Sequence, residues 1–228
     1  MTRSALLLLA DSRFPAGAHA YSGGLESAVA AGRVHDAATL HEFLLGRVHT
    51  GALVCASFAA AAWLCADREV LAELDHEYDV RLLSPTLRAH SRRLGRHLLR
   101  AVTATWPSPR LELVRGLDAI GAHHPVVLGA ACAAAELTVD DAATCAVHAT
   151  LAAPANAATK LLGLDPHEVS AVLARLAPTA DRIATKAVTL ARMARLRSDP
   201  GMLPALGSPL LDLTAEDHAT WEVRLFAS

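Results

Sequence analysis

The segment FPAGAHAYSGGLE, residues 14–26, contains the residues of this chain that come closest to a known catalytic motif. Its AYSGG string around Ser22 differs by one residue from the G-x-S-x-G turn that presents the nucleophilic serine of α/β hydrolases. That turn follows a β-strand, and Pro15 and Gly17 interrupt the approach to Ser22. We therefore expect no serine hydrolase, and we interpret the paired glycines as a tight turn into a helix that begins near Leu25.

Twelve histidines make metal chemistry the second class to consider. None of them lies in an HExxH motif or in a Cys/His cluster with zinc spacing. His123 and His124 are adjacent, so on a helix their side chains point about 100° apart and do not readily chelate one ion. The sequence also lacks the glycine-rich motifs that hold nucleotide phosphates. We expect no catalytic residue, no metal ligand and no cofactor, with a metal-dependent helical enzyme that uses clustered histidines as the first alternative.

The composition favours an all-α fold. Apolar residues make up 53% of the 228 residues, whereas aromatic residues make up only 4%. Alanine and leucine are prominent among the apolar residues, and alanine combines the best helix propensity with a small side chain that lets helices pack closely. The β-branched and aromatic residues that sheets prefer are thinly represented. We predict a single-domain helical bundle of about 8–10 helices with an extended C-terminal tail.

The charge balance argues against general nucleic-acid binding. The formal net charge is −2 and the isoelectric point is about 6.6, so the chain has no overall basic field. Two basic runs, residues 88–100 and 192–197, are interpreted as solvated helix faces. They leave open a second alternative, a helical ligand-binding regulator with a nucleic-acid-binding face.

The spacing of the cysteines and the lengths of the apolar segments indicate the cellular compartment of the protein. The four cysteines form no CxxC pair, which indicates buried free thiols in a reducing environment. The apolar run near the N-terminus is too short for a signal peptide. The longest charge-free stretches, near residues 51–66 and 142–159, are too short or too polar to span a membrane. We predict a soluble cytoplasmic protein without a membrane segment.

Several helices can be placed from the capping residues at their N-termini. The predicted helices span residues 37–66 after Asp36, 67–82, 85–105 after Ser84, 124–137, a segment that starts at the Thr138–Asp141 capping box, and a segment from the Asp165 cap to about Arg197. Prolines fall inside the last two segments, and we expect a kink at Pro154 and a break at Pro178.

The last part of the chain, residues 198–228, differs in character from the rest. It begins with a proline- and glycine-rich stretch, continues with a short amphipathic segment that we expect Thr214 to cap, and ends in apolar residues. Such residues dock either on the parent domain or on another protein. We divide the chain into a helical domain, residues 1–197, which includes a docking loop at 12–26, and a partner-binding tail, residues 198–228.

Both ends of the chain resemble the urease accessory protein UreF family. The N-terminal segment matches the family pattern S-x-x-x-P-x-G-x-x-x-x-S-x-G-L-E at Ser12, Pro15, Gly17, Ser22, Gly24, Leu25 and Glu26. The C-terminal segment resembles S-P-x-x-D…R-H-E-x-x-x-x-R-L-F-x-S, with His218, Arg224, Leu225, Phe226 and Ser228 in place. The match around residues 87–98 is looser. The chain departs from the family at 161–166, which reads LLGLDP, and at Asp217, where the family has arginine.

The resemblance implies the function and the site. UreF-like proteins are all-α homodimers without catalysis of their own, and they bridge UreD (also called UreH) and the nickel-carrying GTPase UreG. The assembly inserts nickel into apo-urease, and UreF is expected to regulate the GTPase. The residues expected to bind partners are Pro15, Gly17, Tyr21, Ser22, Glu26, Lys160, His218, Trp221, Arg224, Leu225, Phe226 and Ser228.

Two of these assignments carry a physical interpretation of their own. Tyr21 offers a rigid amphipathic contact of the kind found at interface hot spots. Glu26, at the start of a helix, either contacts a partner or only interacts favourably with the helix dipole. For the tail, we expect a disordered segment that becomes ordered when it binds UreD and thereby buries Trp221, Leu225 and Phe226.

Overall fold

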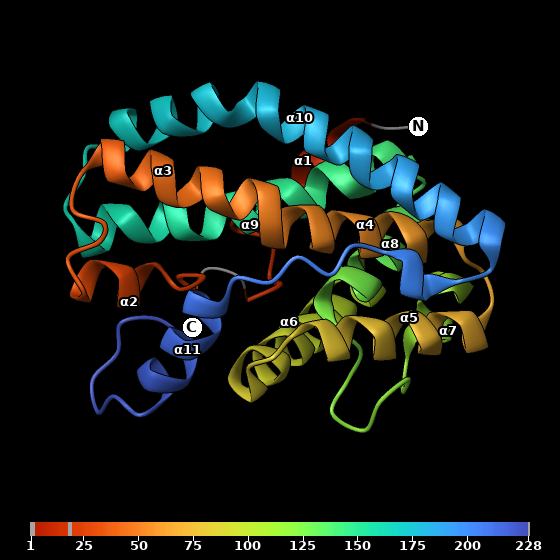
Figure 1. Cartoon of the computed structure of the whole chain (residues 1–228). Helices are drawn as coiled ribbons and strands as arrows, with labels where there is room; N and C mark the ends of the chain where they lie inside the picture. The colour runs from red at the N-terminus through yellow and green to blue at the C-terminus, as the bar shows by residue number, and fades with distance from the viewer. Residues whose placement is uncertain (1–2, 18–19, 228) are drawn as a thin grey trace.

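The computed structural model describes residues 3–17 and 20–227, and these form helices joined by loops with no β-strand (Figure 1). With α3, η2 and α4 counted as one continuous helix, this part of the chain has ten α-helices, so the all-α prediction is confirmed. The elements are α1 (Arg3–Ala10), α2 (Leu25–Ala30), α3 (Ala37–Arg47), the π-helical η2 (Val48–Ala52), α4 (Leu53–Leu64), α5 (Arg68–Arg81), α6 (Pro85–Thr105), α7 (Pro109–Val114), α8 (His124–Ala134), α9 (Val139–Leu161), α10 (Pro166–Arg197), the 3-10 turn η3 (Pro200–Met202) and α11 (Pro209–Ala219).

The helix starts predicted from capping residues are confirmed. Asp36, Ser84 and Thr138 each accept a hydrogen bond from the backbone N–H of the third helical residue. Asp165 accepts one from the second, and Pro166 occupies the first helical position as predicted. These caps depend on residues within one turn of each other, which is why the sequence reveals them.

Two expectations about helices were wrong, and two short helices were missed. The segment around Pro178 does not break, because α10 continues through it to Arg197. Pro178 and Ala174, whose carbonyl loses its helical partner there, are both exposed, so water can bond that carbonyl. Helix α11 begins at Pro209, and Thr214 lies inside it with its hydroxyl bonded to the carbonyl of Leu211. The short helices α1 and α7 were not predicted.

Helix α4 lies at the centre of the structure. It packs against α8, α9 and α10, while α10 lies along one side of the protein and α5, α6 and α7 lie on the opposite side (Figure 1). Its alanines leave room for close neighbours, and Ala56, Ala59 and Ala60 are fully buried. An alanine-rich helix that is buried on all faces explains how a core with few aromatic rings can still be dense.

The helical segment Ala37–Leu64 is, in the described part of the chain, the one segment long and apolar enough to cross a membrane by length and composition. However, 56% of its most apolar window is buried inside the protein. Its apolar composition is therefore explained by its central position among the other helices.

A buried polar cluster joins α5, α6 and the start of α8. The Arg92 guanidinium donates to Asp75 at 2.9 Å and to Asp79 at 2.8 Å. The backbone N–H of His123 donates to Asp75 at 2.6 Å, and its ring bonds Asp79 and Ser91 at 2.9 Å each. Burial lowers the pKa of His123, so its ring is neutral at pH 7. This histidine is therefore part of the structural core.

The closest approach of α4 and α8 requires a glycine at position 129. A Cβ atom built on Gly129 would overlap the carbonyl oxygen of Ala59 and lie 2.8 Å from the Cβ of Ala62. We expect Gly129→Ala to lower the free energy of unfolding by about 1–3 kcal/mol, because the two helices must move apart. Urea denaturation followed by circular dichroism measures this loss.

Gly46 in α3 provides the matched control. It is also helical, but a Cβ atom there would have no neighbour within 4 Å. Gly46→Ala should therefore leave stability unchanged or raise it by about 0.5–1 kcal/mol. Equal losses in the two variants would contradict the close packing of α4 against α8.

Candidate functional site

Two segments from opposite parts of the sequence meet and form one surface, which we call the terminal junction (residues 20–26 and 216–227). After η3 the chain runs extended to α11, and the segment beyond α11 returns to the N-terminal loop (Figure 1). The backbone N–H of Ala227 donates to the carbonyl of Ala20 at 2.8 Å, and that of Ser22 donates to the carbonyl of Ala227 at 3.1 Å. A single parallel bridge pairs Tyr21 with Ala227.

Glu26 holds the C-terminal segment in place. It is the second residue of α2 and is only 8% exposed. Its carboxylate accepts hydrogen bonds from the backbone N–H groups of Leu225 at 2.8 Å and Phe226 at 3.0 Å, and from Nε2 of His218 at 3.0 Å. Hydrogen bonds to an ionised carboxylate are stronger than those between neutral groups. Glu26 thus has a role within the chain that neither of its two predicted roles included. The expectation of a disordered tail is wrong for this segment, because Phe226 is already buried on its own chain.

The two glycines before α2 make this arrangement possible. Gly23 and Gly24 have φ angles of +59° and +85°, in the left-handed region that favours glycine. The carbonyl of Gly23 accepts a hydrogen bond from Nη1 of Arg47 at 2.8 Å. A Cβ atom on Gly24 would lie 3.0 Å from Cδ2 of Leu211 in α11. The predicted tight turn into a helix at Leu25 is confirmed.

Helix α11 is anchored to a second element, the start of α6. The Glu216 carboxylate accepts hydrogen bonds from the Ser84 hydroxyl and, at 2.9 Å, from the backbone N–H of Thr86. These hydrogen bonds lower the pKa of Glu216 and keep it ionised at neutral pH. Ser84 could be predicted as a cap, but its contact with Glu216 could not, because no local pattern indicates a partner 132 residues away.

Comparison with known proteins identifies the family to which this chain belongs. The UreF family model matches residues 34–177. The urease accessory protein UreF of Mycobacterium sp. (strain JLS) is 40% identical over 229 residues, which cover 100% of this chain and 99% of the relative. That of Mycobacterium tuberculosis (strain H37Rv) is 39% identical over 233 residues and covers both chains completely. The chain belongs to the UreF family. These relatives are named as accessory proteins and not as urease enzymes, in agreement with the predicted absence of catalysis.

The full-length UreF relatives cover the terminal junction, whereas the UreF family model does not. The model leaves out residues 1–33 and 178–228, which contain the whole junction. The full-length relatives cover both ends, and a third one, from Mycolicibacterium vanbaalenii, is 39% identical over 226 residues covering 98% of this chain and 97% of its own. Membership of the UreF family therefore extends to the segments that build the site.

Several residues predicted to bind partners are buried in this UreF chain. These are Tyr21, Ser22, Glu26, His218 and Phe226.

Tyr21 packs edge-on against the ring of His90 at 5.2 Å between centroids. Burial lowers the pKa of His90 to about 4, and the nearby Arg93 and Arg224 act in the same direction, so this ring is neutral at pH 7.

The other predicted residues lie at the surface or at its edge. Pro15, Lys160, Arg224 and Leu225 are exposed, Gly17 and Trp221 are partly buried, and Ser228 lies outside the described residues. Nζ of Lys160 lies 5.7 Å from the centroid of the Phe226 ring, so it belongs to the same neighbourhood as the tail. Asp217, which replaces the arginine of the family pattern, accepts a hydrogen bond from the Trp221 indole at 3.1 Å.

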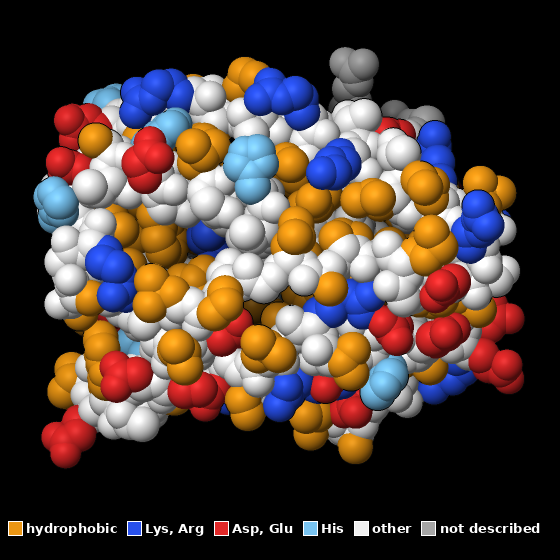
Figure 2. Space-filling view, viewed as in Figure 1, with side chains coloured by type: hydrophobic (Ala, Val, Ile, Leu, Met, Phe, Trp, Pro, Cys, Tyr) orange, Lys and Arg blue, Asp and Glu red, His pale blue; other side chains and the backbone are white. Residues whose placement is uncertain are grey.

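The surface around the terminal junction is partly hydrophobic. The exposed large apolar side chains of α11 and of the segment after it are Leu210, Leu213, Val223 and Leu225. The space-filling view shows hydrophobic side chains over the region of α11 and a hollow between α3 and α11 (Figure 2). Exposed apolar residues grouped in this way mark interaction surfaces more often than isolated ones do.

The histidines of this UreF chain form no metal centre where the structure describes them. Within residues 3–17 and 20–227, no three His, Cys, Asp or Glu side chains are grouped so that they could hold a metal ion. His123, which the first alternative invoked, is engaged by Asp79 and Ser91. The alternative of an enzyme with clustered histidines therefore has no geometric support in this part of the chain.

Proposed function

We propose that this chain acts as a scaffold in urease maturation. In this proposal a cytoplasmic homodimer joins UreD (UreH) to the GTPase UreG, helps to insert nickel into apo-urease and regulates GTP hydrolysis. Membership of the UreF family and the name of its relatives support a role as a urease accessory protein. The observation that carries the proposal is the terminal junction, where both chain ends build one surface with exposed apolar residues.

We assign different roles to the buried and the exposed residues of the terminal junction. Glu26 holds the C-terminal segment through His218 on one side and Leu225 and Phe226 on the other. The segment that these hydrogen bonds hold in place presents the side chains of Val223 and Leu225 to solvent. A loop held in this way loses little conformational entropy when a partner binds. We therefore expect the buried residues to fix the loop and the exposed ones to contact UreD.

The exposed contact residue Val223 provides a direct test. Burial of a valine or leucine side chain at an interface contributes about 1.5–3 kcal/mol, and a carboxylate placed there opposes burial. Val223→Asp should therefore reduce the affinity for the UreD-type protein at least about tenfold. Co-purification from cells that express both proteins, followed by a titration of the purified components, measures this effect.

Leu196 at the end of α10 is the matched control. Its exposed fraction, 84%, is almost the same as the 83% of Val223, and it lies outside the terminal junction. Leu196→Asp should leave the UreD complex intact, and deletion of residues 220–228 should abolish it. If the Val223→Asp variant and the deletion variant both bound the UreD-type protein as tightly as the unchanged chain does, the docking role of the tail would be rejected.

The proposal keeps the functional division into a helical domain, residues 1–197, and a tail, residues 198–228. Light scattering after size-exclusion chromatography tests the expected homodimer. GTP hydrolysis by UreG, measured with and without the UreF–UreD complex, tests the regulatory role. An unchanged hydrolysis rate across these mixtures would remove GTPase regulation from the proposal.

A further inference from the structure

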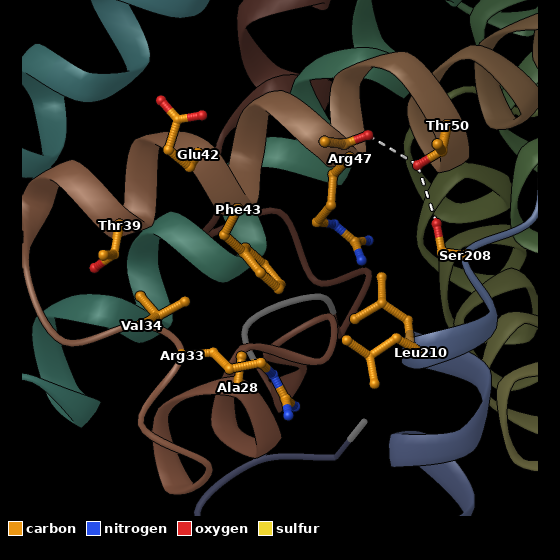
Figure 3. Close-up of a pocket in the computed structure, with 12 residues that line it drawn as sticks. Ala28, Arg33, Val34, Thr39, Glu42, Phe43, Arg47, Thr50, Ser208 and Leu210 are labelled. Atoms are coloured by element: carbon orange, nitrogen blue, oxygen red, sulfur yellow. Dashed lines mark hydrogen bonds between the residues drawn. The ribbon is translucent and has the colours of Figure 1, made fainter.

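A pocket lies between α3, α11 and the connection from α2 to α3 (Figure 3). Its volume is about 380 Å³. Apolar side chains supply most of its wall, with Val34 and Phe43 on one side and Leu210 and Leu211 of α11 on the other. Ser208 bonds the hydroxyl of Thr50 at 3.1 Å at the rim. The pocket therefore has a compact apolar interior that joins the tail to the helical domain.

Arg47 extends from α3 into this pocket (Figure 3). Its Nη1 donates to the carbonyl of Gly23, and its guanidinium carbon lies 5.9 Å from the centroid of the Phe43 ring. Its Nε is buried and has no hydrogen-bond partner in the part of the chain that the structure describes. Burial lowers the pKa of Arg47, because the charged form is removed from water.

No carboxylate among the described residues forms an ion pair with Arg47. Glu42 lies on the same helix and at the edge of the pocket, but its side chain points away from Arg47 (Figure 3). It contacts His41 at 3.2 Å instead. Buried charges in proteins are normally paired, and a buried donor of a charged group without a partner destabilises the structure. Arg47 is thus a buried cation without an ionic partner among residues 3–17 and 20–227.

We propose that this pocket binds a small organic carboxylate with a compact apolar body. The carboxylate pairs with the Arg47 guanidinium, whose planar donors match carboxylate geometry. The apolar body packs against Phe43, Val34 and Leu210. The volume lies near the lower end of the roughly 300–1,000 Å³ of ligand pockets, which favours a body of a few carbon atoms. Inorganic phosphate is disfavoured, because it has no apolar body to pack against Val34, Phe43 and Leu210.

Calorimetric titration of the full chain with hexanoate tests this proposal. Hexanoate should bind saturably, and butanoate, shorter by two methylene groups, should bind about 15-fold more weakly, since each buried methylene group contributes about a fourfold change in affinity. Hexanamide, which has the same shape without the charge, and inorganic phosphate should each bind at least tenfold more weakly than hexanoate. Absence of saturable hexanoate binding, or equal binding of hexanamide or phosphate, would overturn the proposal.

Variants at the two walls locate the site. Arg47→Gln should abolish hexanoate binding, but this variant also loses the bond to Gly23 and can disturb the fold. Leu210→Ser provides the second measurement, because Leu210 is a half-exposed wall residue on α11 and its loss should weaken hexanoate binding about fivefold. The Leu213→Ser variant, changed on the same helix but outside the pocket wall, should bind hexanoate as tightly as the unchanged chain does. Equal binding by the two leucine variants would overturn the proposed location.

Hydrogen exchange provides a readout that needs no other protein. A ligand that spans Phe43 of α3 and Leu210 of α11 stabilises the contact between these helices. Saturating hexanoate should therefore slow exchange at the amides of α11 and leave α5 unaffected. Unchanged exchange in α11 at saturation would contradict binding in this pocket. Because these measurements use the isolated chain, their outcome is independent of any role in urease maturation.

Discussion

Replacing Arg92 with methionine is expected to lower the free energy of unfolding by about 3–5 kcal/mol, as breaking a buried ion pair usually does. Arg92 is buried and bonds both Asp75 and Asp79. Methionine fills a similar space but leaves the buried Asp75 carboxylate without its cation. The loss arises from this uncompensated charge, and urea denaturation at pH 7 measures it directly.

The exposed pair between Arg115 and Glu112 provides the control for this prediction. Its atoms also lie 2.8 Å apart, but both side chains are more than half exposed. Arg115→Met should change stability by no more than about 1 kcal/mol, because solvent screens exposed ion pairs. If Arg92→Met were as mild as Arg115→Met, the cluster around His123 would not be a structural support for α5, α6 and α8.

Replacing Glu26 with alanine is expected to release the C-terminal segment while the helical core stays folded. The variant removes the acceptor for three hydrogen bonds, from His218, Leu225 and Phe226. Hydrogen bonds to charged groups contribute about 1.5–3 kcal/mol each. We expect the free energy of local opening to fall by about 2–4 kcal/mol, because water satisfies the freed groups in the open state.

Amide hydrogen exchange at Leu225 and Phe226 measures this opening. A fall of 2–4 kcal/mol corresponds to exchange about 30- to 1,000-fold faster. Glu222→Ala, in the same segment but at an exposed position, should leave both rates unchanged. Unchanged exchange in Glu26→Ala would show that the backbone bridge between Tyr21 and Ala227 and apolar packing hold the terminal junction without Glu26. In the proposed function, Glu26→Ala should also weaken UreD binding.

The helix starts could be predicted because their determinants are local. Asp36, Ser84, Thr138 and Asp165 each bond a backbone group two or three residues away. Such a bond forms whenever the chain begins a helix there, whatever lies around it. The all-α class could be predicted for a related reason, since helix propensity and apolar spacing act within a few turns.

The break predicted at Pro178 was wrong because the outcome depends on surroundings that a local pattern does not contain. Pro178 lies on an exposed face of α10, where solvent can bond the freed carbonyl of Ala174. The remainder of α10 is held by packing against α3, α4 and α9. This packing outweighs the loss of one helical hydrogen bond. The short helices α1 and α7 were missed for the same reason, because helices of eight and six residues depend on tertiary contacts for their stability.

The candidate site also has features that the sequence predicts and features that only the folded structure reveals. The residue types of the terminal junction could be read from the sequence, and their resemblance to the UreF family indicated that both ends matter. That Glu26 binds the tail of its own chain, across 192 to 200 residues, follows from the folded structure alone. The same holds for Arg47, whose buried Nε becomes significant only when α11 closes one side of its pocket. Local sequence encodes caps and propensities, but contacts between distant segments arise only when the whole chain buries its apolar surface in one arrangement.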